Sequence, residues 1–219
     1  MGKKPTVVVA GYGTWAKAEK NPAAQISAQL KSQSNKFCDL ICLEIPVESR
    51  SLSTLLEASL MKYRPDAWVG LGVSTNSGVI RPEMVGINWR HFNVPDISGS
   101  LLELIPVVES GPVAYQSDLP NANMVERLKS AGIPSVISFH AGTHLCNQML
   151  YTVRHLVETH RLHTRSGFIH VPQTPQNVTS VDDPEAMGSS MSLSLMTQAI
   201  SLCIEEIVAD LTPPVTQAA

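Results

Sequence analysis

The chain of 219 residues is poor in cysteine, in aromatic side chains and in charge of either sign. Its four cysteines form no CxxC pair and no dense secreted framework, so we expect reduced thiols and a cytoplasmic protein. A net charge of -3 gives no basis for partners such as nucleic acid or an anionic membrane surface. No apolar run approaches the roughly 20 residues that span a bilayer, and residues 1–5 do not resemble a signal peptide.

Apolar runs alternate with amphipathic segments along the chain. The pattern predicts buried strands at 6–10, 67–71 and 167–171, further strands at 39–45 and 134–139, and an edge strand at 113–116. It predicts helices at 22–31, 51–63, 121–131, 146–159 and 190–211. Residues 72–110 form an irregular insertion, and residues 173–188 form a polar loop. The order predicts a single α/β domain over residues 1–219, an α/β/α sandwich around a mostly parallel twisted sheet.

Two short motifs indicate nucleophilic chemistry. Cys146 follows a small-residue turn and opens a predicted helix, where free N–H groups and the helix dipole favour a thiolate. His170 ends the last predicted strand and is a candidate base. The carboxyl ends of parallel strands meet at one edge of a sheet, so we expect both residues there. Glu83, on the insertion, is a candidate to orient the imidazole. The sequence therefore predicts a cysteine hydrolase.

The sequence gives less support to other interpretations of the same residues. A cysteine at a helix start is commonly a small buried residue, and a histidine that ends a strand is commonly structural. His140 and His144 are four residues apart but straddle a glycine, and no HExxH motif or Cys/His pair accompanies them. Gly11-Tyr12-Gly13 lacks the third glycine of a dinucleotide fingerprint. We therefore predict neither a metal nor a cofactor.

The motifs resemble those of pyroglutamyl peptidase type I, also called pyrrolidone-carboxylate peptidase, a cysteine peptidase family. The segments that carry the resemblance are Ala141-Gly142-Thr143-x-Leu145-Cys146-Asn147, Gly167-Phe168-Ile169-His170-Val171-Pro172 and Ile80-x-x-Glu83-x-Val85-Gly86-Ile87-Asn88. The resemblance implies a phosphorylase/hydrolase-like fold, homotetramers and no cofactor. It also implies an acyl-enzyme mechanism, with Cys146 as nucleophile, His170 as general base and acid, and Glu83 orienting the imidazolium.

The pocket departs from the family pattern. The two family phenylalanines that pack on the lactam ring match Tyr12 and Trp15, which keep an aromatic slot but make it larger and more polar. The aromatic residue two positions before the nucleophile is His144 here. With Asn21 and Val73, these residues are predicted to contact the substrate.

Family arginines near the reacting carbonyl are also missing. Asn93 stands where the family has an arginine, and Met84 replaces a basic residue after the glutamate. Arg90 is predicted to reach into the site from three residues away, and Arg81 is a second possible substitute.

Three functions follow from these observations. The first is removal of an N-terminal pyroglutamyl residue from peptides. The second is hydrolysis of a different neutral acyl amide or lactam, with His144 and His140 contacting a new group. The third is a binding protein on a retired hydrolase fold, which the missing arginines favour and the intact Cys146, His170 and Glu83 oppose.

Overall fold

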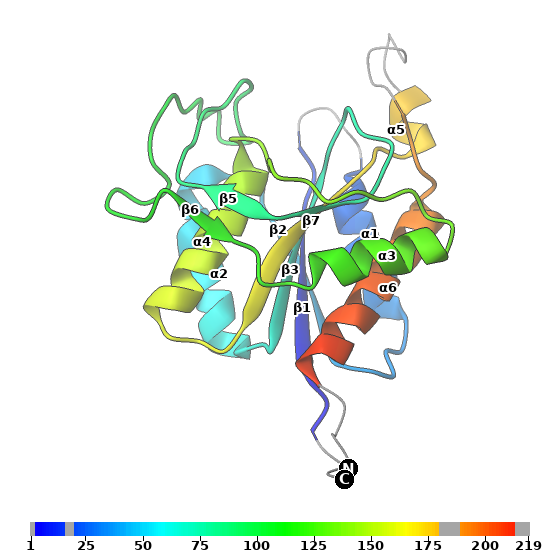
Figure 1. The fold of residues 1–219 in the computed structure, drawn as a ribbon. Helices are drawn as coiled ribbons and strands as arrows, with labels where there is room; N and C mark the ends of the chain where they lie inside the picture. Colours follow the sequence, from blue (N-terminus) through cyan, green and yellow to red (C-terminus); the bar gives the residue numbers. More distant parts are fainter. Residues whose placement is uncertain (1–2, 16–19, 180–188, 213–219) are drawn as a thin grey trace.

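The computed structural model describes residues 3–15, 20–179 and 189–212. Its central sheet has the strand order β2-β1-β3-β7-β4 (Figure 1). Four strands are parallel, namely β1 (Thr6–Tyr12), β2 (Asp39–Ile45), β3 (Ala67–Val73) and β7 (Arg165–Val171). The short β4 (Arg81–Glu83) runs antiparallel to β7 at the edge. The predicted α/β fold with a mostly parallel sheet is confirmed.

Helices cover both faces of this sheet, because its inner strands are apolar on both sides. On one face α1 (Pro22–Ser32), α3 (Asn121–Ser130) and α6 (Leu193–Leu211) pack over Val7 and Val9. On the other face α2 (Ser49–Tyr63) and α4 (Leu145–Thr159) pack over Val8 and Trp68. Figure 1 shows the two groups of helices on opposite sides of the strands. None of the described helices combines the length and the apolar character needed to cross a bilayer.

Helix starts follow local capping chemistry. The Asn21 side chain accepts a hydrogen bond from the Ala23 N–H at 2.9 Å, and Pro22 occupies the first turn of α1. The Ser192 hydroxyl accepts one from the Leu195 N–H at 3.3 Å. This cap explains why α6 begins at Leu193 rather than at residue 190.

The insertion after β3 contains the short strands that its irregular pattern predicts. Besides β4, it includes β5 (Val85–Ile87), which pairs antiparallel with β6 (Ala114–Gln116) in a separate two-stranded sheet. The polar segment 173–188 contains the short helix α5 (Pro175–Thr179), and residues 180–188 lie outside the described part of the chain.

The strand predicted at 134–139 is not a regular strand of the structure. The segment runs alongside and parallel to residues 80–84, through the bridges Ser135–Ile80 and Ser138–Glu83 and four backbone hydrogen bonds. It therefore runs opposite to β7. The two serines are buried, whereas Val136 and Phe139 are 47% and 70% exposed. Ile137 is half-buried, so the apolar run does not mark a core strand.

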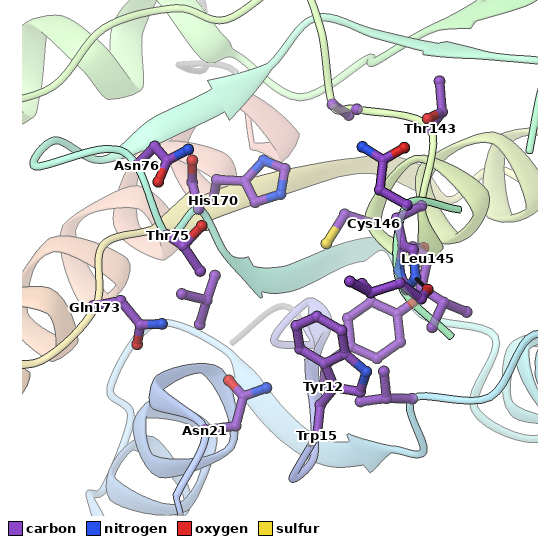
Figure 2. Close-up of a pocket in the computed structure, with 18 of the residues that line it drawn as sticks. Tyr12, Trp15, Asn21, Thr75, Asn76, Thr143, Leu145, Cys146, His170 and Gln173 are labelled. Carbon is purple, nitrogen blue, oxygen red and sulfur yellow. Dashed lines mark hydrogen bonds between the residues drawn. The ribbon is translucent and has the colours of Figure 1, made fainter. Parts of the chain in front are cut away.

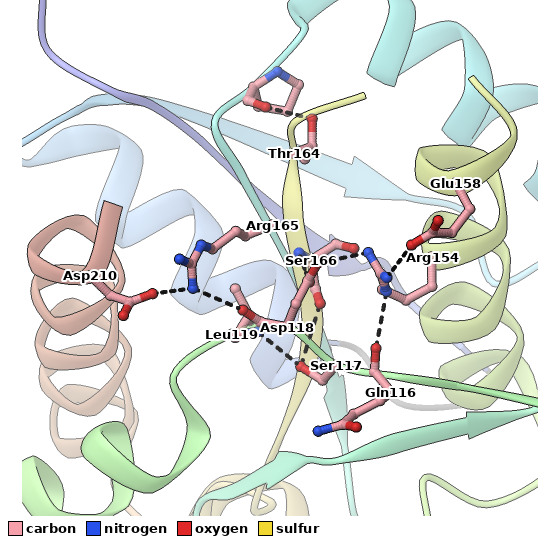
Figure 3. Close-up of polar contacts among 11 residues, drawn as sticks. Gln116, Ser117, Asp118, Leu119, Arg154, Glu158, Thr164, Arg165, Ser166 and Asp210 are labelled. Carbon is pink, nitrogen blue, oxygen red and sulfur yellow. Dashed lines mark hydrogen bonds and ion pairs between the residues drawn. The ribbon is translucent and has the colours of Figure 1, made fainter. Parts of the chain in front are cut away.

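A buried arginine ties α4 to the sheet (Figure 3). Arg154 donates to the Gln116 carbonyl at 3.0 Å, and to carboxylate oxygens of Asp118 and Glu158 at 2.8 Å each. Asp118 in turn accepts the N–H of Ser166, on β7, at 2.5 Å. Burial raises the pKa of Asp118, and the Ser166 N–H and the Arg154 charge oppose that rise. This network fixes α4 against β7, the two elements that carry Cys146 and His170.

Candidate active site

Cys146 lies in the first turn of α4 and is partly exposed to a cavity (Figure 2). The first backbone bond of the helix runs from the Gln148 N–H to the His144 carbonyl, so the N–H groups of residues 145–147 precede the helical ladder. Gly72 on β3 makes room for the sulfur, because a Cβ there would come within 2.7 Å of Sγ. The thiol is thus held between a helix N-terminus and the carboxyl end of a central strand.

His170 joins this thiol to a buried carboxylate. The imidazole and the Cys146 side chain point toward each other (Figure 2), and Cys146 raises the pKa of His170. On its other side, Nδ1 lies 2.7 Å from Oε1 of Glu83. Glu83 is fully buried on β4, which pairs with β7 so that Glu83 faces Phe168 and its carboxylate reaches His170. The structure therefore brings together the three predicted catalytic side chains, which come from α4, β7 and β4.

Electrostatics favour a charged imidazole at this place. Burial disfavours the imidazolium, but the negative charge and hydrogen bond of Cys146, followed by those of Glu83, outweigh it. The net effect raises the pKa of His170 to about 9. Burial and then the Cys146 charge raise the pKa of Tyr12 well above its usual value, so that phenol stays neutral. An arrangement of thiolate, imidazolium and carboxylate can perform nucleophilic acyl transfer.

The cavity beside Cys146 has a volume of about 600 Å³. Tyr12, Trp15 and His144, the three aromatic residues predicted to contact the substrate, line it, and each has a polar atom next to a backbone carbonyl. The Tyr12 hydroxyl donates to Leu145 at 2.6 Å, and the Trp15 indole N–H to Pro95 at 3.2 Å.

The His144 ring completes an aromatic slot with Tyr12 and Trp15. Nε2 of His144 lies 3.0 Å from the Val94 carbonyl, and the His144 ring packs against Phe92 at an interplanar angle of 36°, with centroids 4.0 Å apart. Burial lowers the pKa of His144, against smaller opposing effects of the Val94 carbonyl and Asp96. The imidazole is therefore neutral near pH 7, and His144 acts as an aromatic wall rather than a charge.

The remaining predicted substrate contacts have different outcomes. Val73 and Asn21 line the cavity, but the Asn21 amide is engaged, donating to the Gly13 carbonyl at 2.7 Å and capping α1. The prediction that Arg90 reaches into the site is wrong. Its guanidinium donates twice to the Pro106 carbonyl, at 3.1 and 2.7 Å, and lies outside the cavity. Arg81, the second possible substitute, does line the cavity.

Three further residues of the cavity wall, Thr75, Asn76 and Gln173, did not emerge from the sequence. Thr75 and Gln173 each lie two positions after a central strand, β3 and β7. The rule that sites form beyond the carboxyl ends of parallel strands could have indicated both. Across the described residues, no three His, Cys, Asp or Glu side chains gather as a metal site would require.

Comparison with known proteins agrees with this geometry. The family model for pyroglutamyl peptidase matches residues 5–210. The chain belongs to the pyroglutamyl peptidase family. Among curated relatives of the family, pyrrolidone-carboxylate peptidase of Streptococcus pneumoniae (strain 70585) is 33% identical over 202 residues, 92% of each chain. The Vibrio parahaemolyticus protein of the same name is 30% identical over 203 residues, again 92% of each chain.

Solved structures of family members have the same fold. A mutant pyrrolidone carboxyl peptidase from the hyperthermophile Pyrococcus furiosus superposes with a TM-score of 0.90 at 28% identity, covering 94% of this chain and 100% of that one. Pyroglutamyl peptidase I from Bacillus amyloliquefaciens gives a TM-score of 0.88 at 26% identity, covering 94% and 98%.

Proposed function

We propose that this protein is a cysteine omega-peptidase that removes an N-terminal pyroglutamyl residue from peptides through an acyl-enzyme. The observation that carries the proposal is that Cys146 and His170 line one cavity beside an aromatic slot, with Nδ1 of His170 2.7 Å from Oε1 of buried Glu83. Membership of the pyroglutamyl peptidase family gives the acyl group that this slot would hold.

In the proposed reaction the Cys146 thiolate attacks the carbonyl carbon of the pyroglutamyl group, forming an S–C bond. The imidazolium of His170 gives its proton to the leaving amine as the C–N bond breaks. His170, now neutral, then takes a proton from water, whose oxygen attacks the thioester and releases pyroglutamate with the thiolate restored. Glu83, 2.7 Å from Nδ1, stabilises each imidazolium state.

Negative charge develops on the carbonyl oxygen in both steps. The N–H groups of residues 145–147 precede the backbone ladder of α4 and are proposed to stabilise that oxygen, together with the positive end of the helix dipole. No arginine is required in this role, which fits the position of Arg90 away from the cavity.

The slot formed by Tyr12, Trp15 and His144 suits a neutral, flat ring. The Tyr12 hydroxyl, the Trp15 indole N–H and Nε2 of His144 are each engaged with a backbone carbonyl, which leaves the ring faces for apolar contact. A five-membered lactam held there would place the exocyclic carbonyl that joins it to the next residue at Cys146.

Turnover of a fluorogenic pyroglutamyl amide under reducing conditions tests the proposal. We expect turnover in the wild type, loss in Cys146→Ala, and retention in the matched control Cys42→Ala. Cys42 lies on β2, and burial raises the pKa of its thiol to about 11, so it is a poor nucleophile. Turnover that survives in Cys146→Ala would contradict the mechanism. Cleavage of other neutral acyl amides but not of pyroglutamyl amide would favour the different acyl substrate.

Three broader proposals accompany this function. Residues 1–219 form one domain, since both apolar cores share the same sheet. The protein assembles as a homo-oligomer, a tetramer by resemblance, since Val113, Leu104 and Phe139 are 81%, 72% and 70% exposed. It works in the cytoplasm, where its four unpaired cysteines stay reduced. Mass measurement in solution tests the oligomer.

A further inference from the structure

Arg81 brings a permanent positive charge to the cavity wall. It lies on the edge strand β4, and its Cα pairs with that of His170 across the β4–β7 ladder. Its side chain is 32% exposed and lines the same cavity as Cys146. The guanidinium therefore lies next to the reacting pair, at the sheet edge.

Strand order places this charge on the opposite side of the reacting pair from the aromatic slot. Along β1-β3-β7-β4 come Tyr12, then Gly72 with the Cys146 sulfur against it, then His170, then Arg81. Figure 2 shows the aromatic residues Tyr12 and Trp15 on one side of Cys146 and His170, and Asn76 beyond His170 as seen from Cys146. The cavity thus has an aromatic end and a cationic end, with Cys146 and His170 between them.

The Arg81 guanidinium has N–H donors that are not used in hydrogen bonds within the described part of the chain. Nη2 donates to the Ser138 hydroxyl at 2.8 Å, which fixes the direction of the side chain. Nε is buried and forms an ion pair with Oε1 of Glu83 at 4.0 Å, a separation too long for a hydrogen bond. Nη1 has no bond to any part of the chain that the structure describes. Ser138 also accepts the N–H of His140 at 3.4 Å, so the same hydroxyl positions a second cavity residue.

The polarity of the reaction decides which part of a substrate meets Arg81. This step rests on the proposed function. The acyl ring occupies the aromatic end, and His170 must reach the leaving nitrogen to protonate it. The leaving residue therefore extends past His170 toward β4. A planar guanidinium with free donors binds a carboxylate strongly and with directional preference.

We infer that Arg81 binds a carboxylate on the residue released from the pyroglutamyl group. The enzyme therefore favours short substrates in which that carboxylate is close to the scissile amide. Two sources have this chemistry: the free α-carboxylate of a pyroglutamyl dipeptide, and the acidic side chain of aspartate or glutamate at the released position.

The ratio of kcat/KM values for matched acid and neutral substrates tests this inference. The first arm compares pyroglutamyl-leucine with its C-terminal amide. The second compares pyroglutamyl-glutamate amide with pyroglutamyl-glutamine amide. One charge-assisted hydrogen bond predicts an acid preference of about tenfold in the arm that has the right source. Arg81→Gln brings that ratio close to one, and Arg81→Lys keeps part of it. The matched control Arg90→Gln removes an arginine outside the cavity and keeps the ratio.

The ratio of kcat/KM for acid and neutral substrates separates carboxylate binding by Arg81 from a purely structural role of that residue. If Arg81 acted only through Glu83 and His170, Arg81→Gln would slow acid and neutral substrates equally, and the unchanged ratio would overturn the inference. A wild-type ratio near one in both arms would overturn it as well, with the peptidase function intact. Absence of turnover for every pyroglutamyl substrate would overturn the proposed function and this inference with it. Binding of the same substrate pairs to Cys146→Ala gives the ratio without turnover.

Discussion

Gly72 offers a sharp test of how the sulfur is positioned. A Cβ at this glycine would lie 2.7 Å from Cys146 Sγ and 2.7 Å from the Cζ of Phe168, about 0.7 Å short of ordinary contact at 3.4 Å. The backbone cannot retreat, because β3 pairs with β1 on one side and β7 on the other. In Gly72→Ala the sulfur must move instead. Misplacement approaching 1 Å predicts a loss of kcat/KM of about 10- to 100-fold.

The matched control is Gly70→Ala, two residues earlier on the same strand and face. Its Cβ would contact the Phe168 ring and would lie 2.8 Å from Met149 Sδ. Cys146 is not among the three atoms nearest to it. Both variants overpack the same layer, and each is expected to lose about 1–3 kcal/mol of unfolding free energy. Only Gly72→Ala should slow pyroglutamyl amide turnover and alkylation of Cys146. Equal kinetics in two folded variants would refute the view that Gly72 makes room for the thiolate.

Two further predictions concern the charges around His170. Glu83→Gln keeps an acceptor for Nδ1 but removes the carboxylate 2.7 Å away, so kcat/KM should fall by about 10- to 100-fold relative to the wild type. Glu83→Ala, which also removes the acceptor, is the comparison variant. Unchanged turnover in Glu83→Gln would contradict the role of the charge. Wild-type kcat/KM should fall as pH rises through about 9, where His170 loses the proton that the leaving amine needs. In Cys146→Ala the pKa of His170, followed by NMR, should drop, because Cys146 makes the largest contribution that raises it; a titration near 9 in both proteins would argue against the ion pair.

Local patterns predicted most of the regular elements. The strand at 39–45 and the helix that ends at Tyr63 have the expected ends, since their periodicity and flanking breakers are local. The segment 134–139 failed because an apolar run does not reveal which side chains face outward, and here the buried ones are Ser135 and Ser138.

The candidate site was predicted unevenly for a similar reason. Cys146 and His170 stand at the start of a helix and the end of a strand, so their neighbours in sequence identify them. The prediction for Arg90 was wrong because its nearness in sequence to Asn93 says nothing about the Pro106 carbonyl that binds its side chain. Asn21 lines the cavity, but its amide serves the helix cap and the loop at Gly13, a use that depends on how the first loop folds back.

The sequence by itself determined the alternation of strands and helices, the thiol at the start of α4, and the imidazole on β7. These depend on periodicity, capping and turn chemistry over a few residues. Only the tertiary structure decided that Glu83, 87 positions from His170, reaches its Nδ1, that Gly72 accommodates the sulfur, and that Arg81 rather than Arg90 lines the cavity. Such contacts depend on strand order and register, which are set when distant apolar surfaces pack together and not by any one segment alone.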